Sequence, residues 1–318
     1  MTSLFKKALL GAAITAGLGA GAGMAKDLVM GSTSPTSSHF TITVAMSKAI
    51  QKGIEGANAT VIETGASVDN VLRLARDEID LGLATGGILI QAREGIGKFD
   101  GNPIPDTVAL YPYSASVLLT AVRADSGVES LSGLAGKKFS PGIRGSAAES
   151  LISKAMGDFG IDVDLVHGTV GDAVEGIKNR HLVGYAKYGA GSAIDATLQE
   201  LMTSTDMRLI GFNAEEEAQV LATSKGVGFT TLAADMVPGS GEVRTPKVNV
   251  FFLTRVAVMD DDTAYNIAKA VHENMDILIE AWPKMASYDM AADAMATMDG
   301  GIAYHPGAAR YWKEVAGK

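Results

Sequence analysis

The chain has 318 residues, no cysteine and a net charge of −9, and 47% of its residues are hydrophobic. The lack of cysteine excludes thiol catalysis, disulfides, iron–sulfur clusters and cysteine-ligated zinc. The acidic balance argues against a general binder of nucleic acid or of anionic membranes, which needs a basic surface. The composition is that of a globular protein, and the length exceeds the size at which one hydrophobic core stops growing, so we expect two lobes.

Residues 1–25 have the pattern of a signal peptide. Two lysines precede an uncharged Ala/Gly-rich stretch at 8–23, and small residues flank Met24 as they do at a cleavage site. The stretch is too short and too weakly hydrophobic for a membrane anchor, and no cysteine is present to carry a lipid anchor. We therefore predict an exported protein, located in the periplasm if the cell is Gram-negative.

Short apolar segments alternate with helical patterns along the rest of the chain. Strands are predicted at residues 27–30, 59–62, 80–84 and 117–122, near 165, and at 182–186 and 248–258. Helices are predicted from the Ser/Thr-rich loop to residue 50, at 67–76, 146–159, 173–178 and 260–279, and around 310–312. This βαβ rhythm predicts a largely parallel sheet with right-handed crossovers. Aspartates at 260–262 place negative charge at a helix N-terminus, where the helix dipole favours it.

The pattern changes near residue 118, where a second βαβ series begins. Crossing strands near 118 and in the region 230–250 fit two α/β lobes. We expect lobe 1 to contain residues 26–118 and about 250–318, and lobe 2 to contain residues 119–249. Ligands of such folds bind in a crevice at the carboxyl ends of strands, so the loops there are candidate sites.

The loop at 31–38, between the first strand and the first helix, is rich in hydroxyl groups. Hydroxyls and free backbone N–H groups at a helix N-terminus can hold an anion such as a carboxylate. Ordinary capping by Ser37 or Ser38 is the alternative, and His39 either touches a ligand or favours the turn. The candidate ligand-binding residues here are Ser32, Ser34, Thr36, Ser37 and His39.

Three other strand ends add candidates. In the turn at 64–67, helix capping by the serine is the simpler explanation. The two glycines at 86–87 permit close approach of a backbone or ligand. Either polar side chain at 187–188 can line a cleft. These strand ends contribute Ser67, Thr85, Gly86, Gly87, Lys187 and Tyr188.

The turn at 140–146 carries Arg144 next to a glycine and ahead of a helix. Such an arginine can clamp a carboxylate through charged hydrogen bonds worth about 1.5–3 kcal/mol, and a solvated surface arginine is the alternative. Gly145 and Ser146 complete the turn. Ser146 and Glu149 have the spacing of a capping box, which explains this serine without a ligand.

No recognised catalytic or metal-binding motif is present. The histidines form no H-x-x-x-H or H-E-x-x-H pattern, no G-x-S-x-G elbow occurs, and no acidic segment has the spacing of a calcium loop. The 14 methionines stand mostly at helical core spacing, which indicates core filling. We therefore expect no catalytic residues, no metal and no cofactor, in a protein that is not an enzyme.

Over the mature chain, the order of landmarks resembles the TAXI family of TRAP-transporter solute receptors. The segments that carry the resemblance are GSTS at 31–34, TGASVDN at 64–70, VRADSG at 122–127, LSGLAGKK at 131–138, GIRGS at 142–146 and HPGAARY at 305–311. The resemblance implies a two-lobed α/β periplasmic-binding-protein fold, type II-like, with the ligand cleft between the lobes. It also implies a small acidic solute, often glutamate or 2-oxoglutarate, that is passed to a TRAP-type membrane permease. The family positions that line the cleft correspond to Ser34, 85–87 and 145–146.

The sequence departs from this family where the ligand is concerned. Residues 36–40 stand where the family usually has glycines followed by an aromatic pair. Residues 85–87 stand where a Gln-Ser-Asp-like turn is common, and Arg144 stands where a proline is common. Polar side chains that would recognise an amino group are therefore missing, and Arg144 adds a cation. We therefore expect a carboxylate without a recognised α-amino group, or a sulfonate, and at least about tenfold weaker binding for Arg144→Ala, which corresponds to ~1.4 kcal/mol.

Two main alternatives stay open: a receptor for an ABC importer with the same fold, and a secreted enzyme such as a lyase or transferase. Turnover of a bound acid separates the enzyme from the receptors, and neighbouring permease or ATPase genes separate the two receptor types. A sensory role, in which the protein presents its ligand to a membrane kinase, is a further alternative. We expect a monomer whose partners are a small organic-acid ligand and the permease, with no nucleic acid.

Overall fold

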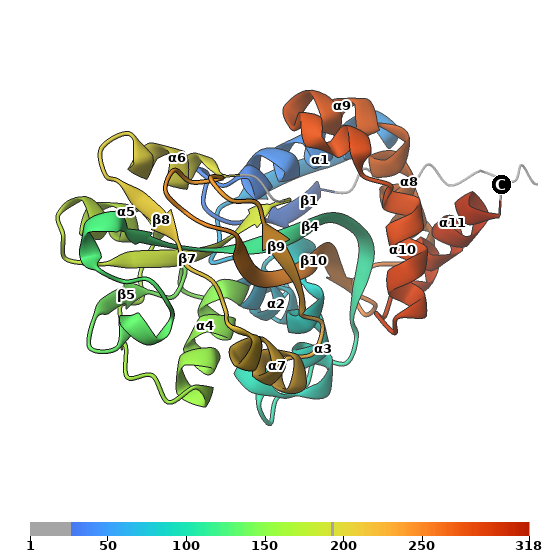
Figure 1. Ribbon diagram of the computed structural model, residues 1–318. Coiled ribbons are helices and arrows are strands. Elements are labelled where there is room, and N and C mark those ends of the chain that lie inside the picture. The colour runs from blue at the N-terminus through green and yellow to red at the C-terminus, as the bar shows by residue number, and fades with distance from the viewer. Residues whose placement is uncertain (1–26, 192–193, 318) are drawn as a thin grey trace, which may run out of the picture.

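The computed structural model describes residues 27–191 and 194–317, so the predicted signal peptide lies outside the described residues. The strands form one mixed, curled sheet in the order β2-β1-β3-β10-β4-β7-β5-β6, with β8 paired to β4 and β9 paired to β10 (Figure 1). The strands are β1 Asp27–Gly31, β2 Asn58–Ile62, β3 Leu81–Thr85, β4 Thr107–Arg123, β5 Lys138–Ser140, β6 Asp164–Leu165, β7 Gly184–Ala190, β8 Met207–Leu209, β9 Gly228–Leu232 and β10 Val243–Arg255. The helices are α1 Ser38–Gly53, α2 Ser67–Ala75, α3 Gly86–Glu94, α4 Ala147–Asp158, α5 Val170–Lys178, α6 Ala196–Met202, α7 Ala214–Thr223, α8 Asp261–Glu273, α9 Met275–Ala281, α10 Met290–Asp299 and α11 Pro306–Ala316.

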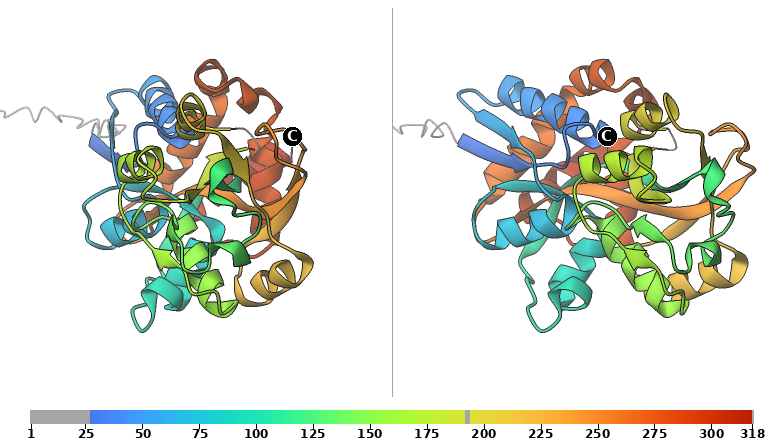
Figure 2. Two further views of the ribbon diagram at one scale, coloured as in Figure 1. Left: turned by 60° about the vertical axis from the view of Figure 1, so that its left-hand side comes forward. Right: turned by 90° about the vertical axis from the view of Figure 1, so that its left-hand side faces the viewer.

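Two long antiparallel strands, β4 and β10, run through the middle of the molecule and join its two lobes (Figures 1 and 2). On one side β3 pairs with β10, and β1 and β2 continue the sheet in parallel. On the other side β7 pairs with β4, and β5 and β6 continue it in parallel. We call the part with β1–β3, α1–α3 and α8–α11 the first lobe, and the part with β5–β9 and α4–α7 the second lobe.

The alternation of side chains along the two long strands distributes the core over both faces of the sheet. In the second lobe Leu119 packs with α5 and α6, whereas its neighbour Leu118 packs with α4 and α7. In the first lobe Phe252 packs with α1 and the C-terminal helices, whereas Phe251 packs with α2 and α3. Because successive strand side chains point to opposite faces, one nearly continuous apolar run serves both helix layers.

The early elements coincide with the predicted ones to within a few residues, but the sheet is mixed and not largely parallel. Every strand pair that includes β4 or β10 is antiparallel. These strands return through the middle of the sheet, which the βαβ rhythm of the flanking segments does not reveal. Helices α3, α6, α7 and α10 are not identified from the sequence.

The long helix predicted at 260–279 is two helices, α8 and α9. Asn274 leaves the helical region with φ −116 and ψ 36, and its side-chain amide donates to the Ala270 carbonyl at 2.8 Å. A local side-chain bond of this kind competes with the helical backbone ladder. The N-terminus of α8 agrees with the charge pattern, because Asp260 accepts a hydrogen bond from the N–H of Thr263 at 2.8 Å.

Candidate functional site

A small cavity of about 50 Å³ lies between the two lobes, at the ends of strands. The first lobe and β10 line it with Thr33, Ser37, His39, Ala66, Ser67, Leu83, Thr85 and Val250. The second lobe lines it with Ile143, Ser146, Ala147, Ala148, Ala186, Lys187 and Tyr188. A few convergent polar groups in a largely apolar wall are the usual composition of a small-molecule site.

Three helices begin at the cavity wall with a hydroxyl cap. Ser37 caps α1, Thr85 caps α3 and Ser146 caps α4, each accepting a hydrogen bond from a first-turn N–H at 3.1–3.4 Å. Capping by a hydroxyl satisfies one of the orphan donors at each helix start. The positive ends of three helix dipoles therefore converge on the cavity, which favours negative charge there.

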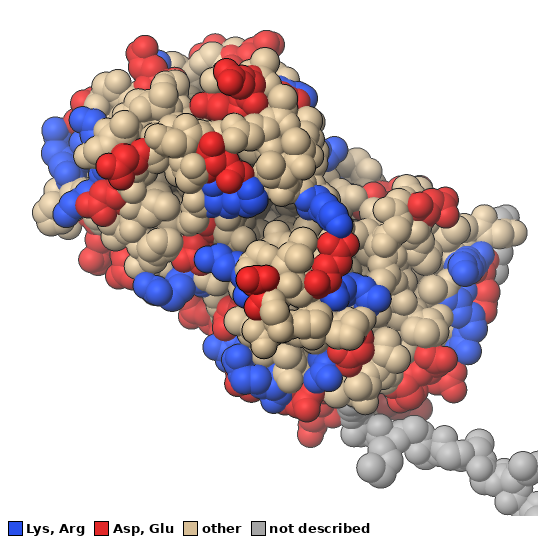
Figure 3. Space-filling view, turned by 90° about the horizontal axis from the view of Figure 1, so that it is seen from below, with Lys and Arg blue, Asp and Glu red and all other residues tan. Residues whose placement is uncertain are grey.

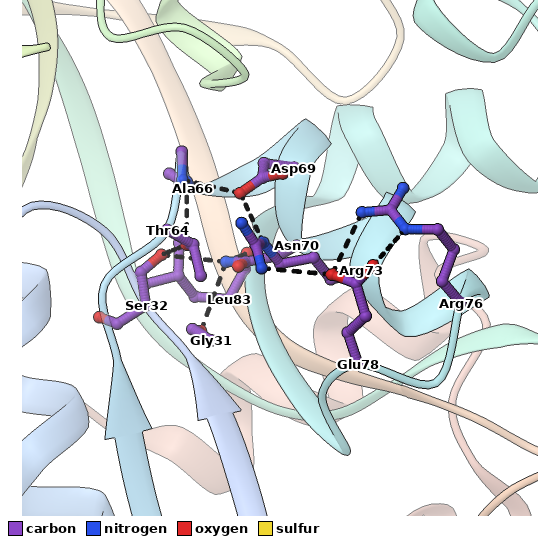
Figure 4. Close-up of polar contacts among 11 residues, drawn as sticks. Gly31, Ser32, Thr64, Ala66, Asp69, Asn70, Arg73, Arg76, Glu78 and Leu83 are labelled. Atoms are coloured by element: carbon purple, nitrogen blue, oxygen red, sulfur yellow. Dashed lines mark hydrogen bonds and ion pairs between the residues drawn. The ribbon is translucent and has the colours of Figure 1, made fainter.

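Asn70, on α2, ties together the strand ends that carry the first-lobe wall (Figure 4). Its buried amide nitrogen lies 3.3 Å from the Gly31 carbonyl oxygen, 3.0 Å from that of Ser32 and 2.8 Å from that of Leu83. The Thr64 hydroxyl also donates to the Ser32 carbonyl, at 2.8 Å. Helix α2 is thereby fastened to the ends of β1 and β3, and the loops that follow them are held in place.

His39 lines the cavity and is buried, with 5% of its surface exposed. Its Nδ1 lies 3.0 Å from the Tyr113 hydroxyl and its Nε2 lies 3.2 Å from the Ser116 hydroxyl. Burial lowers the pKa of His39 to about 4, helped by the Lys187 ammonium and opposed by the Asp195 carboxylate. The imidazole is therefore neutral at physiological pH, and one ring nitrogen donates while the other accepts.

Lys187 supplies the cation of the cavity wall. Its Nζ forms an ion pair with Asp195 and donates to the Thr197 hydroxyl at 2.9 Å. The Lys187 and Asp195 side chains are only 11% and 2% exposed. Asp195 also caps α6, accepting from the N–H of Leu198 at 3.0 Å. Because a buried charge needs a partner, Asp195 stabilises the Lys187 ammonium in its buried position.

The cavity brings together some of the sequence-predicted residues and leaves others out. Those that line it are Ser37, His39, Ser67, Thr85, Ser146, Lys187 and Tyr188. Those that do not line it are Ser32, Ser34, Thr36, Gly86, Gly87, Arg144 and Gly145. Lys187 and Tyr188 stand within β7 and not in a loop, so they face opposite sides of the sheet, towards α6 and towards α4 respectively.

The excluded residues have other surroundings. The Ser32 hydroxyl points into the first lobe and donates to Thr43 at 2.9 Å. The Thr36 hydroxyl lies 3.1 Å from that of Ser34 and 3.5 Å from that of Thr197, across the lobe boundary. Arg144 is exposed, and its guanidinium makes no hydrogen bond or ion pair with any residue of the described ranges.

Two of the expected helix caps differ from the prediction. Ser67 is the first residue of α2, and Ala66, at φ 70, holds the cap position without a side-chain bond. The Ser67 hydroxyl instead accepts from the N–H of Thr85 at 3.3 Å. The expected capping box at Ser146 is half formed, because the Glu149 carboxylate accepts from the N–H of Gly145 at 2.7 Å and not from that of Ser146.

Gly87 meets the second lobe. A Cβ built on this residue would lie 2.7 Å from the carbonyl oxygen of Lys225, a distance that real contacts do not show. Nearby, the Lys225 ammonium pairs with Glu94 at 2.7 Å across the lobe boundary. The close backbone approach expected from this glycine is therefore made by the chain itself.

Sequence reasoning missed Asp195, Thr197, Tyr113 and Ser116. A signal for Asp195 was present, because an aspartate directly before a helical run is a preferred N-cap. No sequence pattern pairs it with Lys187, which stands eight residues earlier on β7. Tyr113 and Ser116 belong to the long apolar run of β4, where a hydroxyl looks like a minor interruption of a strand.

A larger groove of about 570 Å³ adjoins the cavity, because Thr85, Ala147 and Tyr188 line both spaces. It runs between α3 of the first lobe and α4 and α7 of the second. Seen from below, the molecule is hollowed between the lobes, and basic and acidic side chains lie along the rim (Figure 3). The cavity therefore lies next to a solvent-facing groove at the lobe boundary.

Within residues 27–191 and 194–317, no group of three or more His, Asp or Glu side chains is placed to hold a metal ion. In the same part of the chain, no helix combines the length and the apolar character that a membrane crossing requires.

Solved structures share this two-lobed fold. A putative L-cystine ABC transporter protein from Listeria monocytogenes is 12% identical, with a TM-score of 0.52 over 83% of this chain and 98% of that one. A periplasmic transporter is 12% identical, with a TM-score of 0.53 over 82% and 87% of the two chains. The substrate-binding protein of an amino acid ABC transporter is 14% identical, with a TM-score of 0.50 over 81% and 100%. At these identities the likeness concerns the fold, and it confirms the expected two-lobed α/β class.

The sequence itself matches a protein family over most of its length. The match to the NMT1-like family extends from residue 30 to residue 316, through both lobes and both crossing strands. The chain therefore belongs to the NMT1-like family.

Proposed function

We propose that this protein is an exported solute receptor that captures a small organic anion and delivers it to a TRAP-type membrane permease, as the resemblance to the TAXI family implies. One observation carries the proposal: a buried ammonium, that of Lys187, lies at a cavity where α1, α3 and α4 begin. An ammonium and helix N-termini both favour a negatively charged guest. Carboxylates such as 2-oxoglutarate and small sulfonates satisfy this requirement.

The wall also indicates what the remainder of the solute is like. Four alanines, Leu83, Ile143 and Val250 line the cavity beside the polar groups. The neutral His39 and the hydroxyls offer hydrogen bonds but no negative charge to hold an α-amino group. Asp195 is already engaged by Lys187 and by the start of α6. An acid with a short apolar carbon chain and no amino group therefore fits the cavity better than an amino acid does.

Solute capture requires the lobes to move. The cavity volume of about 50 Å³ is well below the roughly 300–1,000 Å³ of most ligand pockets, so a metabolite enters only when the lobes part. We propose that the hinge lies where β4 and β10 pass from one lobe to the other, near residues 114–116 and 248–250. Lobe 1 then contains residues 26–118 and about 250–318, and lobe 2 contains residues 119–249. A solute that touches both lobes then favours the closed form by its differential affinity.

The test has two stages. Native mass spectrometry of the purified protein identifies any co-purified acid, and thermal shift with 2-oxoglutarate, L-glutamate and isethionate measures the preference. A bound acid at 100 times its dissociation constant adds about 2.7 kcal/mol of stability. The stabilisation is expected to disappear in Lys187→Met. Stabilisation by neutral analogues alone would contradict the proposal, and conversion of the acid would identify an enzyme.

Uptake experiments decide between transporter types. In proteoliposomes with the cognate permease, transport driven by a sodium gradient supports the TRAP assignment. Transport that requires ATP would assign the receptor to an ABC importer.

A further inference from the structure

A carbonyl group of the second lobe occupies the N-terminus of a first-lobe helix. The carbonyl oxygen of Gly145 accepts from the N–H of Val68 at 2.8 Å and from that of Asp69 at 3.2 Å. Both donors belong to the first turn of α2, where backbone N–H groups have no partner within the helix. The two lobes are thus joined by backbone hydrogen bonds that exist only while the lobes are together.

The Gly145 peptide is oriented by Glu149. Gly145 has φ +85, in the left-handed region, and its N–H donates to Glu149 Oε2 at 2.7 Å. The Glu149 side chain is 8% exposed, and its Oε1 lies 2.5 Å from Nδ1 of His167. A buried carboxylate held at both oxygens is a rigid acceptor. It fixes the direction of the peptide whose carbonyl reaches α2.

The surface opposite is shaped to receive this peptide. A Cβ on Gly65 would lie 2.4 Å from the carbonyl oxygen of Arg144, so only glycine allows the two backbones to approach. The Gly65 N–H donates to the Asp69 carboxylate at 2.9 Å, which holds the turn before α2 in place. The fit therefore depends on backbone geometry on both sides of the lobe boundary.

We propose that Glu149 is a positioning residue: it holds the Gly145 carbonyl against the N-terminus of α2 and thereby sets how readily the lobes close. The proposal rests on the lobe closure of the proposed function, but not on which acid is bound, because the contact involves no solute. Glu149 lies outside the cavity lining and acts only through the Gly145 peptide.

Disulfide trapping measures closure directly, because the chain has no cysteine of its own. The hydroxyls of Thr36 and Thr197 lie 3.5 Å apart across the lobe boundary, so the double variant Thr36→Cys/Thr197→Cys can cross-link only in the closed form. The rate of cross-linking in oxidised glutathione, without added solute, is followed on non-reducing gels.

Three variants of this parent are then made, each with one further substitution. Glu149→Asp shortens the side chain and is expected to slow cross-linking by about fivefold, which is the effect of losing one net hydrogen bond. Glu149→Gln keeps an oxygen that accepts from the N–H of Gly145, so this variant is expected to cross-link at no less than half of the parent rate. Gly157→Ala is the control, because a Cβ there meets nothing within 4 Å.

Thermal unfolding of each reduced variant shows whether it is folded, and a change confined to closure leaves the midpoint within a few degrees. Gly65→Ala places a methyl group against the Arg144 carbonyl oxygen on the first-lobe side of the contact, and it is also expected to slow cross-linking. Cross-linking of Glu149→Asp and Gly65→Ala at the parent rate would overturn the proposal. So would a parent that does not cross-link, because the lobes would then not reach this arrangement.

Discussion

The two lobes contribute different chemistry to the cavity. The first lobe presents uncharged donors and acceptors, the hydroxyls of Ser37, Ser67 and Thr85 and the neutral imidazole of His39. The second lobe presents the hydroxyl of Ser146 and, as its charged group, the ammonium of Lys187, which pairs with Asp195. In the first wall Ser37 and Thr85 are held by local contacts at helix starts, whereas the buried ammonium of the second depends on its ion pair with Asp195. The charged wall should therefore tolerate substitution far less than the hydroxyl wall.

The largest expected effect is that of Lys187→Ala. It leaves the Asp195 carboxylate buried without its counter-charge, so the free energy of unfolding should fall by about 3–5 kcal/mol. Urea denaturation measures the change. Lys178→Ala is the matched control, because Lys178 pairs with Glu200 at 2.7 Å on the surface, and its loss should cost less than about 1 kcal/mol. If both variants lost the same free energy of unfolding, the buried Lys187–Asp195 pair would not be more sensitive to substitution than a surface pair.

The neutral His39 should make stability depend on pH. Its pKa of about 4 in the folded protein lies below the ordinary 6.5, so the unfolded chain binds more protons between these values. The contribution is complete above about pH 6.5 and is lost as the pH falls through 4, a change of about 3 kcal/mol. Urea unfolding of wild type and His39→Gln at several pH values measures the difference. His181→Gln, at an exposed histidine, should keep the wild-type slope.

A smaller effect is expected for Thr85→Ala. The variant loses the cap of α3, whose hydroxyl accepts from the N–H of Ile88 at 3.4 Å, and should lose about 1 kcal/mol of stability. Thr85→Ser keeps the hydroxyl and should recover most of it. Thermal denaturation compares the two, and an identical loss in both would show that the methyl group matters and the cap does not.

The smallest effect is expected for Arg144→Ala. The side chain is exposed and lies outside the cavity lining, so stability should change by less than about 0.5 kcal/mol. We also expect the affinity for the co-purified acid to change by less than about twofold, in contrast to the tenfold loss predicted from sequence alone. Calorimetry measures the affinity, and a tenfold loss of affinity would show that Arg144 contacts the bound acid.

The sequence predicted cavity-lining residues best where the residue also has a local structural role. Ser37 and Ser146 precede helical patterns, and both cap helices at the cavity wall. Gly87 was recognised as a place of close approach, but the approaching group is the backbone of Lys225. A glycine in the sequence can indicate a close approach, but it does not identify the approaching group.

By itself, the sequence determined the α/β class, the two-lobed plan, most early elements and several helix caps, because periodicity and capping act over a few neighbouring residues. Tertiary structure decided the antiparallel crossing of β4 and β10 and the pairing of Lys187 with Asp195. It also decided the hydrogen bonds between the Gly145 carbonyl and the N-terminus of α2. These contacts join residues whose proximity depends on how the sheet curls and how the lobes meet. Burial and charge pairing arise only once distant segments are brought together.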